Sequence, residues 1–203
     1  MARKYEQRLR ATAAAQTRRR VLDAVYEQVR AAPTEPVSLD RVATAAEVSR
    51  STIYLLFGSR TGLFEALATD LLHRGGFERI VQAAAHPDGR EALRGVIGSC
   101  VTMYAAHLEV LRALASMAVL DTEAMGETIE RMEEGRAIGM ARLAGRLAEQ
   151  GVLRTDLTVD HAADLLWLLT SFHSVDQLHT SRKLPMDQVV RLLVDTAERG
   201  LCR

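Results

Sequence analysis

The chain has few cysteines and no long apolar run, and each absence narrows what the protein can be. It contains two cysteines among 203 residues, Cys100 within an apolar helical pattern and Cys202 next to the C-terminus. This placement does not suggest a disulfide framework, and a reducing cytoplasm is the expected compartment. No apolar segment approaches the roughly 20 residues of a membrane helix, and residues 1–20 lack the apolar core of a secretion signal. We therefore expect a cytoplasmic protein without membrane contact.

Sequence signatures of catalysis and of metal binding are also missing. There is no nucleophile-elbow pattern, no phosphate-binding glycine loop and no metal motif. The six histidines are scattered, without a cysteine or carboxylate partner at ligand spacing. We expect no catalytic residue, no metal and no cofactor, so the chain is not predicted to be an enzyme.

Charge is distributed unevenly along the chain, although its formal sum is zero. Residues 1–60 contain 11 basic and 6 acidic residues, a net charge of +5, whereas residues 61–203 contain 15 and 20, a net charge of −5. A polyanion is attracted to the basic end and not to the acidic one. The sequence therefore predicts a nucleic-acid surface within the first 60 residues.

Apolar residues recur at helical spacing throughout, and no segment alternates with the period of a strand, which predicts an all-α fold. The first helix is expected from about Gln16 to Ala31, with an inward stripe formed by Val21, Leu22, Val25 and Val29. Two short helices follow between residues 38 and 57. Further helices are expected at about 59–73, 90–106, 108–119, 122–150, 158–178 and 185–200, which gives nine helices in total.

Residues 37–64, VSLDRVATAAEVSRSTIYLLFGSRTGLF, contain the two short helical patterns, joined by only a few residues. Ser38 can cap the first helix. Ser49 can cap the second, in which Ile53, Leu56 and Phe57 point inward. This is the layout of a helix-turn-helix, whose second helix lies in the major groove of DNA.

The outward face of that second helix carries residue types that suit DNA contact. Arginine can donate two hydrogen bonds to guanine, serine and threonine can reach base edges or phosphates, and a tyrosine hydroxyl can donate to a phosphate oxygen. Tyr54 could alternatively be a core residue, and the run of arginines at 18–20 could be either a solvated basic face or a phosphate contact. The candidate DNA-binding residues are Ser38, Arg41, Ser49, Arg50, Ser51, Thr52, Tyr54, Leu55 and Arg60.

In their order and spacing, eight residues of this segment resemble the signature V-S-x-x-T-[IL]-Y-x-x-F-x-[ST]-[KR] of the tetracycline-repressor (TetR) family of bacterial transcription regulators. They are Val48, Ser49, Thr52, Ile53, Tyr54, Phe57, Ser59 and Arg60. The motif covers roughly residues 16–72, and the remainder agrees in length and helical pattern. The resemblance implies a nine-helix fold with a basic, flexible arm at 1–15, a three-helix head with the helix-turn-helix at 16–60, and a helical ligand-binding and dimerisation domain at 61–203.

Two departures from the family pattern lie in the same segment. The usual glycine of the turn is Glu47, so a left-handed backbone there would carry a modest strain. At Leu55 and Leu56 the family commonly has His, Tyr or Trp. A backbone contact carried over from the family to Leu55 is therefore in doubt, whereas the fold is not.

The second domain offers a mostly apolar set of residues with two imidazoles, which could bind a small apolar or aromatic effector. For each methionine in this set ordinary core packing is the alternative interpretation, and a hydrogen-bonded core histidine is the alternative for each imidazole. The candidate ligand-binding residues are Met103, His107, Leu111, Met117, Leu165, Leu169, Phe172 and His173.

The last two long helices are expected to form the interface of a homodimer, because the small residues beside Trp167 would allow another helix to approach closely. The candidate interface residues are Trp167, Ser171, Ser174, Val189, Leu192 and Leu193. Since a two-fold dimer reads a two-fold site, the expected operator is an inverted repeat in double-stranded DNA.

These expectations combine into a homodimeric, sequence-specific repressor that a small, mostly apolar ligand releases from its operator. Two alternatives stay open. The chain could be a DNA-binding regulator without a small-molecule ligand, constitutive or controlled by a protein partner, or it could be a helical enzyme with a vestigial head. The second alternative requires a catalytic constellation that residues 74–203 do not display.

Overall fold

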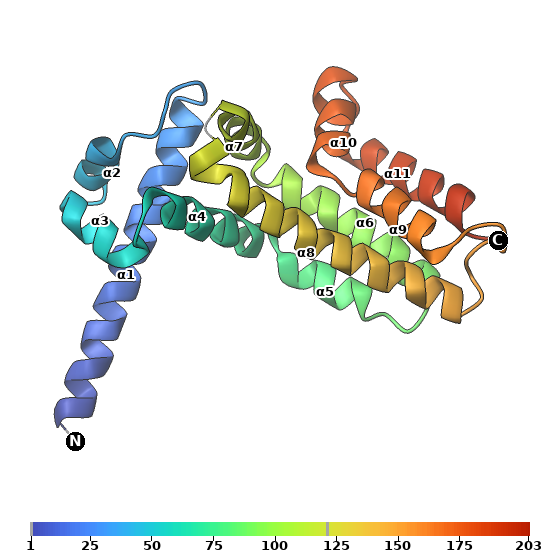
Figure 1. Ribbon diagram of the computed structural model, residues 1–203, viewed down its shortest axis with the longest axis horizontal. Helices are drawn as coiled ribbons and strands as arrows, with labels where there is room; N and C mark the ends of the chain where they lie inside the picture. The colour runs from blue at the N-terminus through green and yellow to red at the C-terminus, as the bar shows by residue number, and fades with distance from the viewer. Residues whose placement is uncertain (1, 121) are drawn as a thin grey trace. The chain divides into compact units, whose positions relative to one another are not determined.

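The computed structural model describes the backbone of residues 2–120 and 122–203, and the side chains of residues 11–118 and 126–203. Regular structure in these residues is helical, with eleven α-helices and one π-helix (Figure 1). The described backbone adds one isolated antiparallel bridge, between Leu153 and Cys202. The all-α prediction is confirmed. None of the described helices is long and apolar enough to cross a membrane.

The chain divides into two compact units, the first made of residues 1–70 and 109–129 and the second of residues 71–108 and 130–203. The first unit contains the whole of α1 (Ala2–Ala31), α2 (Leu39–Ala45) and α3 (Arg50–Phe57). It also contains most of α4 (Arg60–Gly75) and α7 (Leu108–Leu120), and the first residues of α8 (Thr122–Glu149).

Helix α1 begins earlier than the sequence predicts. It runs from Ala2, whereas the expected start is Gln16, so residues 2–15 belong to a helix and not to a flexible arm. These residues include no glycine or proline and are mainly Ala, Arg, Lys, Glu, Gln and Leu, which lose little conformational freedom in a helix. The predicted inward stripe is confirmed, and its members are all buried: Val21, Leu22, Val25 and Val29.

The second unit is built around α6 (Gly89–Ala105), which contacts three other helices of the unit. Those neighbours are α5 (Phe77–Ala84), α10 (Phe172–Asp176) and α11 (Met186–Leu201). Asp88 caps α6 by accepting hydrogen bonds from the amides of Arg90 and Glu91 at 2.8 and 3.1 Å. These two bonds hold the pKa of Asp88 below its ordinary value, because they stabilise its charged form.

The helix count differs from nine at two places, although the architecture is as predicted. Helix α5 lies in a stretch that the sequence left without a helix, and its eight residues are too few for periodicity to stand out. The helix expected over 158–178 is divided into α9 (Val159–Leu169), α10 and the π-helix η1 (Gln177–Ser181). Ser171 causes the first division, because its hydroxyl accepts from the amide of Ser174 at 3.1 Å and thereby caps a new helix.

Arg136 of α8 contacts the C-terminal end of α9, where this division lies. Its guanidinium lies 4.6 Å from the ring centroid of Trp167, donates to the Trp167 carbonyl and pairs with Glu133. It also donates to the Thr170 hydroxyl at 3.4 Å. The side chain is 12% exposed, and its donation gives the Trp167 carbonyl, near the end of α9, a hydrogen-bond partner.

Candidate nucleic-acid interface

Helices α2 and α3 are joined by a tight turn that requires an unusual backbone at Glu47. This residue has φ of 54°, in the left-handed region that glycine favours. The amide of Val48 reaches back to the carbonyl of Ala43 at 2.9 Å, which closes the turn. The expected strain at the glycine position of the motif is therefore present in the structure.

Both short helices are capped as the sequence predicts. The Ser38 hydroxyl accepts from the amide of Arg41 at 3.4 Å, and the Ser49 hydroxyl accepts from the amide of Thr52 at 3.1 Å. Ser49 also bonds the hydroxyls of Ser51 and Thr52, at 2.7 and 2.9 Å. The start of α3 thus carries a cluster of three hydroxyl groups, all on exposed or half-buried residues.

Helix α3 has one buried face and one open face. Ile53 and Phe57 are buried and Leu56 is half-buried, as their spacing predicts. On the other side Tyr54 is 43% exposed and Leu55 is 85% exposed, which rules out the alternative that Tyr54 is a core residue. The open face therefore presents Arg50, Ser51, Tyr54 and Leu55 to whatever the head binds.

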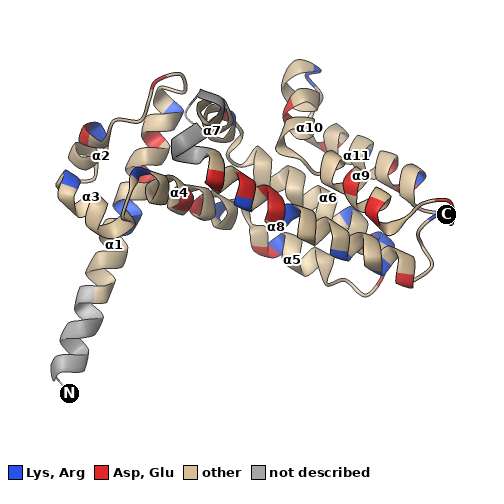
Figure 2. Ribbon diagram, viewed as in Figure 1, with Lys and Arg blue, Asp and Glu red and all other residues tan. Residues whose placement is uncertain are grey.

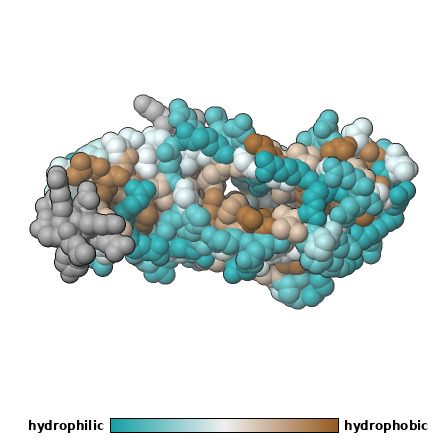
Figure 3. Space-filling model, turned by 90° about the horizontal axis from the view of Figure 1, so that it is seen from below, coloured by the Kyte–Doolittle hydropathy of each residue, from teal (hydrophilic) through white to brown (hydrophobic). Residues whose placement is uncertain are grey.

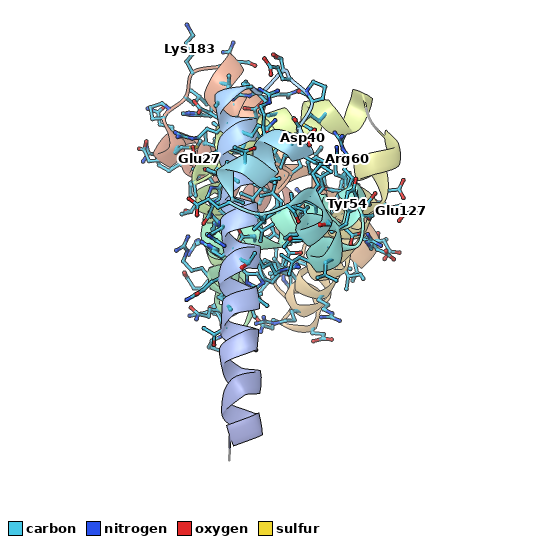
Figure 4. The ribbon with its side chains drawn as sticks, turned by 90° about the vertical axis from the view of Figure 1, so that its left-hand side faces the viewer. Glu27, Asp40, Tyr54, Arg60, Glu127 and Lys183 are labelled. Carbon is cyan, nitrogen blue, oxygen red and sulfur yellow. The ribbon has the colours of Figure 1, made fainter. Side chains whose placement is uncertain are left out.

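Arg50 lies beside two residues of the head, Asp40 and Tyr54. Its guanidinium lies 3.4 Å from both carboxylate oxygens of Asp40, and a hydrogen bond with Tyr54 and the charge of Asp40 raise its pKa. Figure 4 shows Asp40, Tyr54 and Arg60 on the same side of α1, contributed by α2, α3 and α4. Asp40 was not among the predicted residues, and its place in the first turn of α2 gives no sequence signal for this role.

The basic residues near the head are mostly engaged with the protein itself. Arg18 donates to the carbonyl of Leu56 at 3.0 Å and stacks on Phe57 with its guanidinium 4.4 Å from the ring centroid. Arg19 lies 3.0 Å from Asp70, and Arg20 lies 3.6 Å from Glu47. Acidic and basic residues both occur among the helices of the first unit (Figure 2). These three arginines therefore link α1 to its neighbours, and their contact with phosphate stays a prediction.

The remaining predicted residues of this surface lie at its two ends. Arg41 is exposed and bonds Glu35 at 2.8 Å. Arg60 opens α4 with its guanidinium 5.6 Å from the ring centroid of Phe64. Between α3 and α4, Gly62 lies so close to the Phe57 carbonyl that an added Cβ would sit 2.1 Å from the oxygen. Gly62 is a residue that sequence reasoning missed, since nothing in the motif marks a helical glycine as a close contact.

The predicted ligand-binding residues are distributed over both units. Leu111 and Met117 belong to the first unit, and the other six belong to the second. Phe172 and Tyr104 meet edge to face with ring centroids 5.7 Å apart, and Phe172 and His173 do the same. Met103 is buried against Gly75, which fits its alternative interpretation as core. Leu165, Leu169 and His107 are half-buried.

Tyr104 was not singled out from the sequence, because one aromatic within an apolar helical stripe carries no functional signal. Its hydroxyl donates to the Thr170 carbonyl at 3.3 Å, and burial raises its pKa. Tyr104 therefore fixes the end of α9 from the side of α6. Within the second unit the structure brings one predicted residue, Phe172, to this buried tyrosine, while the exposed His173 contacts Phe172.

Three of the predicted dimer residues are buried within a single chain. Val189 and Leu193 point into the core as part of the apolar stripe of α11, and Ser171 is the cap of α10. These three cannot form an exposed interface, so that part of the prediction is wrong. The amphipathic spacing of α11 was correctly recognised, but its buried side was taken for the exposed one.

Trp167 and Leu192 remain exposed, at 39% and 43%, and Ser174 is half-buried with its hydroxyl donating to Leu168. Two further apolar residues of α9, Val159 and Leu168, are also exposed. Beside Trp167 lies a shallow pocket of about 300 Å³, lined by Ala137, Ala163, Asp164 and Trp167. Helices α9 and α11 contact each other, and both carry exposed apolar residues. These residues are candidates for an interface, whereas the buried Ser171, Val189 and Leu193 are not.

Comparison with known proteins places both the head and the fold. Residues 21–67 match the family described as bacterial regulatory proteins, tetR family. No curated protein is significantly similar to the chain in sequence. Among solved structures, the chain is similar to NalD of Pseudomonas aeruginosa, described as the secondary repressor of the MexAB-OprM multidrug efflux pump. The two are 21% identical over 94% of this chain and 98% of NalD, with a TM-score of 0.69.

Two further solved structures have the same architecture. The fatty acid degradation regulator FadR from Bacillus halodurans is 17% identical, with 92% of this chain and 97% of FadR covered and a TM-score of 0.73. The ketosteroid transcriptional regulator KstR2 of Mycobacterium tuberculosis is 17% identical, with 92% and 95% covered and a TM-score of 0.65. At these identities the structural likeness establishes the fold, whereas the match over residues 21–67 establishes the type of head.

Proposed function

Because the chain is a member of the tetR family of bacterial regulatory proteins, we propose that it is a homodimeric repressor that binds an inverted-repeat operator and leaves it when a small apolar ligand binds. DNA binding by the helix-turn-helix follows from the family. Repression, dimerisation and response to a ligand are the proposed steps. The observation that carries the proposal is the open face of α3, which is capped, basic at its start and exposed on four residues.

The chemistry of this face supports sequence-specific rather than general DNA binding. Arg50 is the only long donor on it, and its guanidinium lies beside Asp40 and Tyr54. An arginine on this face can donate two hydrogen bonds to guanine, and such a contact discriminates between base pairs. Ser38, Ser49 and Arg60 at the helix ends are placed for phosphates, which position the head without reading sequence.

Selection of DNA fragments by the purified protein tests this part of the proposal. We expect an inverted repeat with half-site centres about one turn, roughly 34–36 Å, apart or slightly more. Arg50→Ala should cost about 1–3 kcal/mol on that site and relax the preference at one position per half-site, whereas Arg60→Ala should weaken all sequences alike and reduce the salt dependence. Fragments without a shared repeat would contradict sequence-specific binding.

The exposed apolar residues of α9 and α11 support a dimer through these helices. Trp167, Leu168 and Leu192 leave apolar surface open, and the pocket beside Trp167 offers room for a side chain of a second copy. Leu192→Arg should give monomers by light scattering and weaken operator binding. Val81→Arg, a matched change at an exposed apolar residue of α5, should leave the dimer intact. A dimer that survives Leu192→Arg would move the interface elsewhere.

The ligand response rests on the second unit and on the solved neighbours, whose names include regulators of fatty acid degradation and of ketosteroids. The aromatic contacts between Tyr104, Phe172 and His173 offer apolar surface with one imidazole, which suits an apolar or aromatic compound better than a sugar or phosphate. A ligand that releases the operator must prefer the released state by several kcal/mol, about 5.5 for a full reversal.

Titration of apolar compounds against the protein–operator complex tests the ligand response. Phe172→Ala should weaken release while leaving operator affinity without ligand within a few-fold of the parent. Loss of folding in this variant would place Phe172 in the core. If no apolar compound releases the DNA, the alternative is a regulator that acts without a small-molecule ligand, through a protein partner or constitutively.

A further inference from the structure

One side chain on the open face of α3 has no polar role in the candidate interface. Leu55 is 85% exposed, more than any other large hydrophobic residue whose side chain is described. A single exposed leucine is ordinary on a protein surface. Here, however, it lies on the face of the helix that faces DNA if the chain acts as proposed. Hydrophobic residues also reach the surface of the first compact unit in the space-filling view (left of Figure 3).

The polar neighbours of Leu55 already have partners within the head. The hydroxyls of Ser49 and Ser51 bond each other at 2.7 Å, and Arg50 interacts with Asp40 and Tyr54. Leu55 follows Ser51 by four residues, so both lie on one stripe of the helix, directly beside the stripe of Arg50 and Tyr54. The face therefore presents one strong donor at the start of the helix and one large apolar group more than a turn further along it.

We propose that Leu55 reads a thymine in each operator half-site through apolar contact with its C5-methyl group. This inference rests on the proposed DNA-binding function. In the major groove the base edges present hydrogen-bond donors and acceptors, and the thymine methyl is the apolar group among them. A leucine placed against a donor or acceptor would desolvate it without bonding it, which is unfavourable. The leucine thus favours thymine and disfavours the polar edges of guanine and cytosine at its position.

The competing role for Leu55 is contact with deoxyribose carbon atoms along the backbone. That contact would add affinity for every sequence alike and would not depend on the thymine methyl. Replacement of thymine by deoxyuridine removes this methyl and leaves the Watson–Crick pairing and all hydrogen-bonding groups unchanged. The two roles therefore predict different results for the same pair of DNA duplexes.

The test uses the full-length protein and the operator obtained by selection. Each thymine is replaced by deoxyuridine, one symmetric pair of positions at a time, and dissociation constants are measured. At one pair of positions we expect binding to weaken about fourfold per half-site, the effect of withdrawing one methyl group from apolar contact. Leu55→Ala should bind the unmodified operator more weakly by a similar factor and should show no further loss with deoxyuridine at that pair.

Two variants serve as controls. Leu55→Met keeps an apolar side chain of similar length and should retain the sensitivity to deoxyuridine. Val81→Ala, which truncates an exposed apolar residue of α5 in the second unit, should respond to every duplex as the parent does. Because Leu55 is exposed, circular dichroism should show the parent's helix content in Leu55→Ala.

Three results would overturn the inference. Binding could be insensitive to deoxyuridine at every position, Leu55→Ala could retain the sensitivity, or Leu55→Ala could weaken random and operator duplexes equally. Failure of the proposed function looks different, because then no operator is selected from the fragments at all and the inference falls with it.

Discussion

The helix-turn-helix segment, residues 37–64, is shaped by contacts between near neighbours, whereas the second compact unit is held by contacts between distant ones. In the segment, the hydroxyls of Ser38, Ser49 and Ser59 each accept from an amide three residues further on. In the second unit, Arg146 donates to the carbonyls of Ala84 and His86 across about sixty residues.

Other contacts of the second unit span comparable or longer distances along the chain. Gln150 bonds Gly89 at 2.8 Å, Arg94 bonds Glu198 at 2.7 Å, and Leu153 pairs with Cys202. The two regions therefore differ in how much of their structure can be predicted from the sequence alone. Capping groups act within one turn of a helix and can be identified from spacing alone, but a guanidinium that caps a carbonyl sixty residues away cannot.

The comparison predicts that damage to the two regions can be separated, because the only tryptophan, Trp167, lies in the second unit. The largest effect is expected from Gly62→Ala, since the new Cβ would sit 2.1 Å from the Phe57 carbonyl, a backbone atom that cannot move aside cheaply. The head should lose about 2–3 kcal/mol, the cost of overpacking, and operator binding should fall with it. In urea unfolding, the midpoint reported by Trp167 fluorescence should equal that of the parent, while the circular dichroism signal should begin to change at a lower urea concentration than in the parent.

Gly135→Ala is the matched control, because a Cβ at Gly135 of α8 meets nothing within 4 Å. It should stabilise the helix by about 0.5–1 kcal/mol and leave operator binding unchanged. A parallel shift of the fluorescence and circular dichroism midpoints in Gly62→Ala would mean that the two units unfold together, and the separation would be lost.

The converse experiment damages the second unit. Arg136→Met removes the cation from Trp167 and leaves the carbonyl at the end of α9 without its donor, which should cost about 2 kcal/mol. The fluorescence midpoint of Trp167 should fall in urea, and the preference among operator variants should stay as in the parent. Arg142→Ala, at an exposed arginine of the same helix, should change the stability by less than about 0.5 kcal/mol. Equal midpoints for Arg136→Met and parent would show that Arg136 is not the support described.

The candidate DNA surface could be predicted from sequence to a greater extent than the second unit for the same physical reason. Two serine caps, three inward apolar residues and the exposed side of α3 follow from spacing of three and four residues. Asp40 and Gly62 were missed because their roles depend on how α2 lies against α3 and how α4 approaches the end of α3. Such distances are set by packing, which periodicity does not determine.

In the second unit, the sequence predicted that α11 is amphipathic but not which of its sides is buried. Val189 and Leu193 are buried, while Leu192, next to Leu193, is exposed. The break in the helix before Ser171 was not predicted, because a serine within an apolar segment is also compatible with a small residue on a helix face. Only the hydrogen bond to Ser174 shows that it starts a new helix.

A smaller effect tests the strain at the turn of the helix-turn-helix. Glu47→Gly should stabilise the head by about 0.5–1 kcal/mol, because relief of the left-handed backbone outweighs the greater freedom of glycine in the unfolded chain. The ion pair with Arg20 that is lost is exposed and contributes little. Thermal unfolding followed by circular dichroism should show a higher melting temperature for the head.

Lys183→Gly likewise replaces a residue with a left-handed backbone by glycine, here in the second unit, where Lys183 has φ of 57°. It should raise the Trp167 midpoint, whereas Glu47→Gly should leave that midpoint unchanged. Destabilisation of the head by Glu47→Gly would show that the side chain contributes more than the strain costs.

The last prediction concerns labelling of the two cysteines, which both lie in the second unit. Their reaction with a thiol reagent reports the opening of this unit and requires no substitution that would alter its stability. Burial raises the pKa of Cys100 to about 12, although the charge of Arg136 lowers it in part. At pH 8 the reactive thiolate is then on the order of one part in ten thousand of this residue. Burial also raises the pKa of Cys202.

A thiol reagent such as Ellman's should therefore react with neither residue in native protein, and with both at urea concentrations where Trp167 fluorescence changes. Arg136→Met should bring the labelling forward to lower urea, whereas Gly62→Ala should not. Labelling of Cys100 in the parent before the fluorescence transition would mean that the core around α6 opens independently of the end of α9.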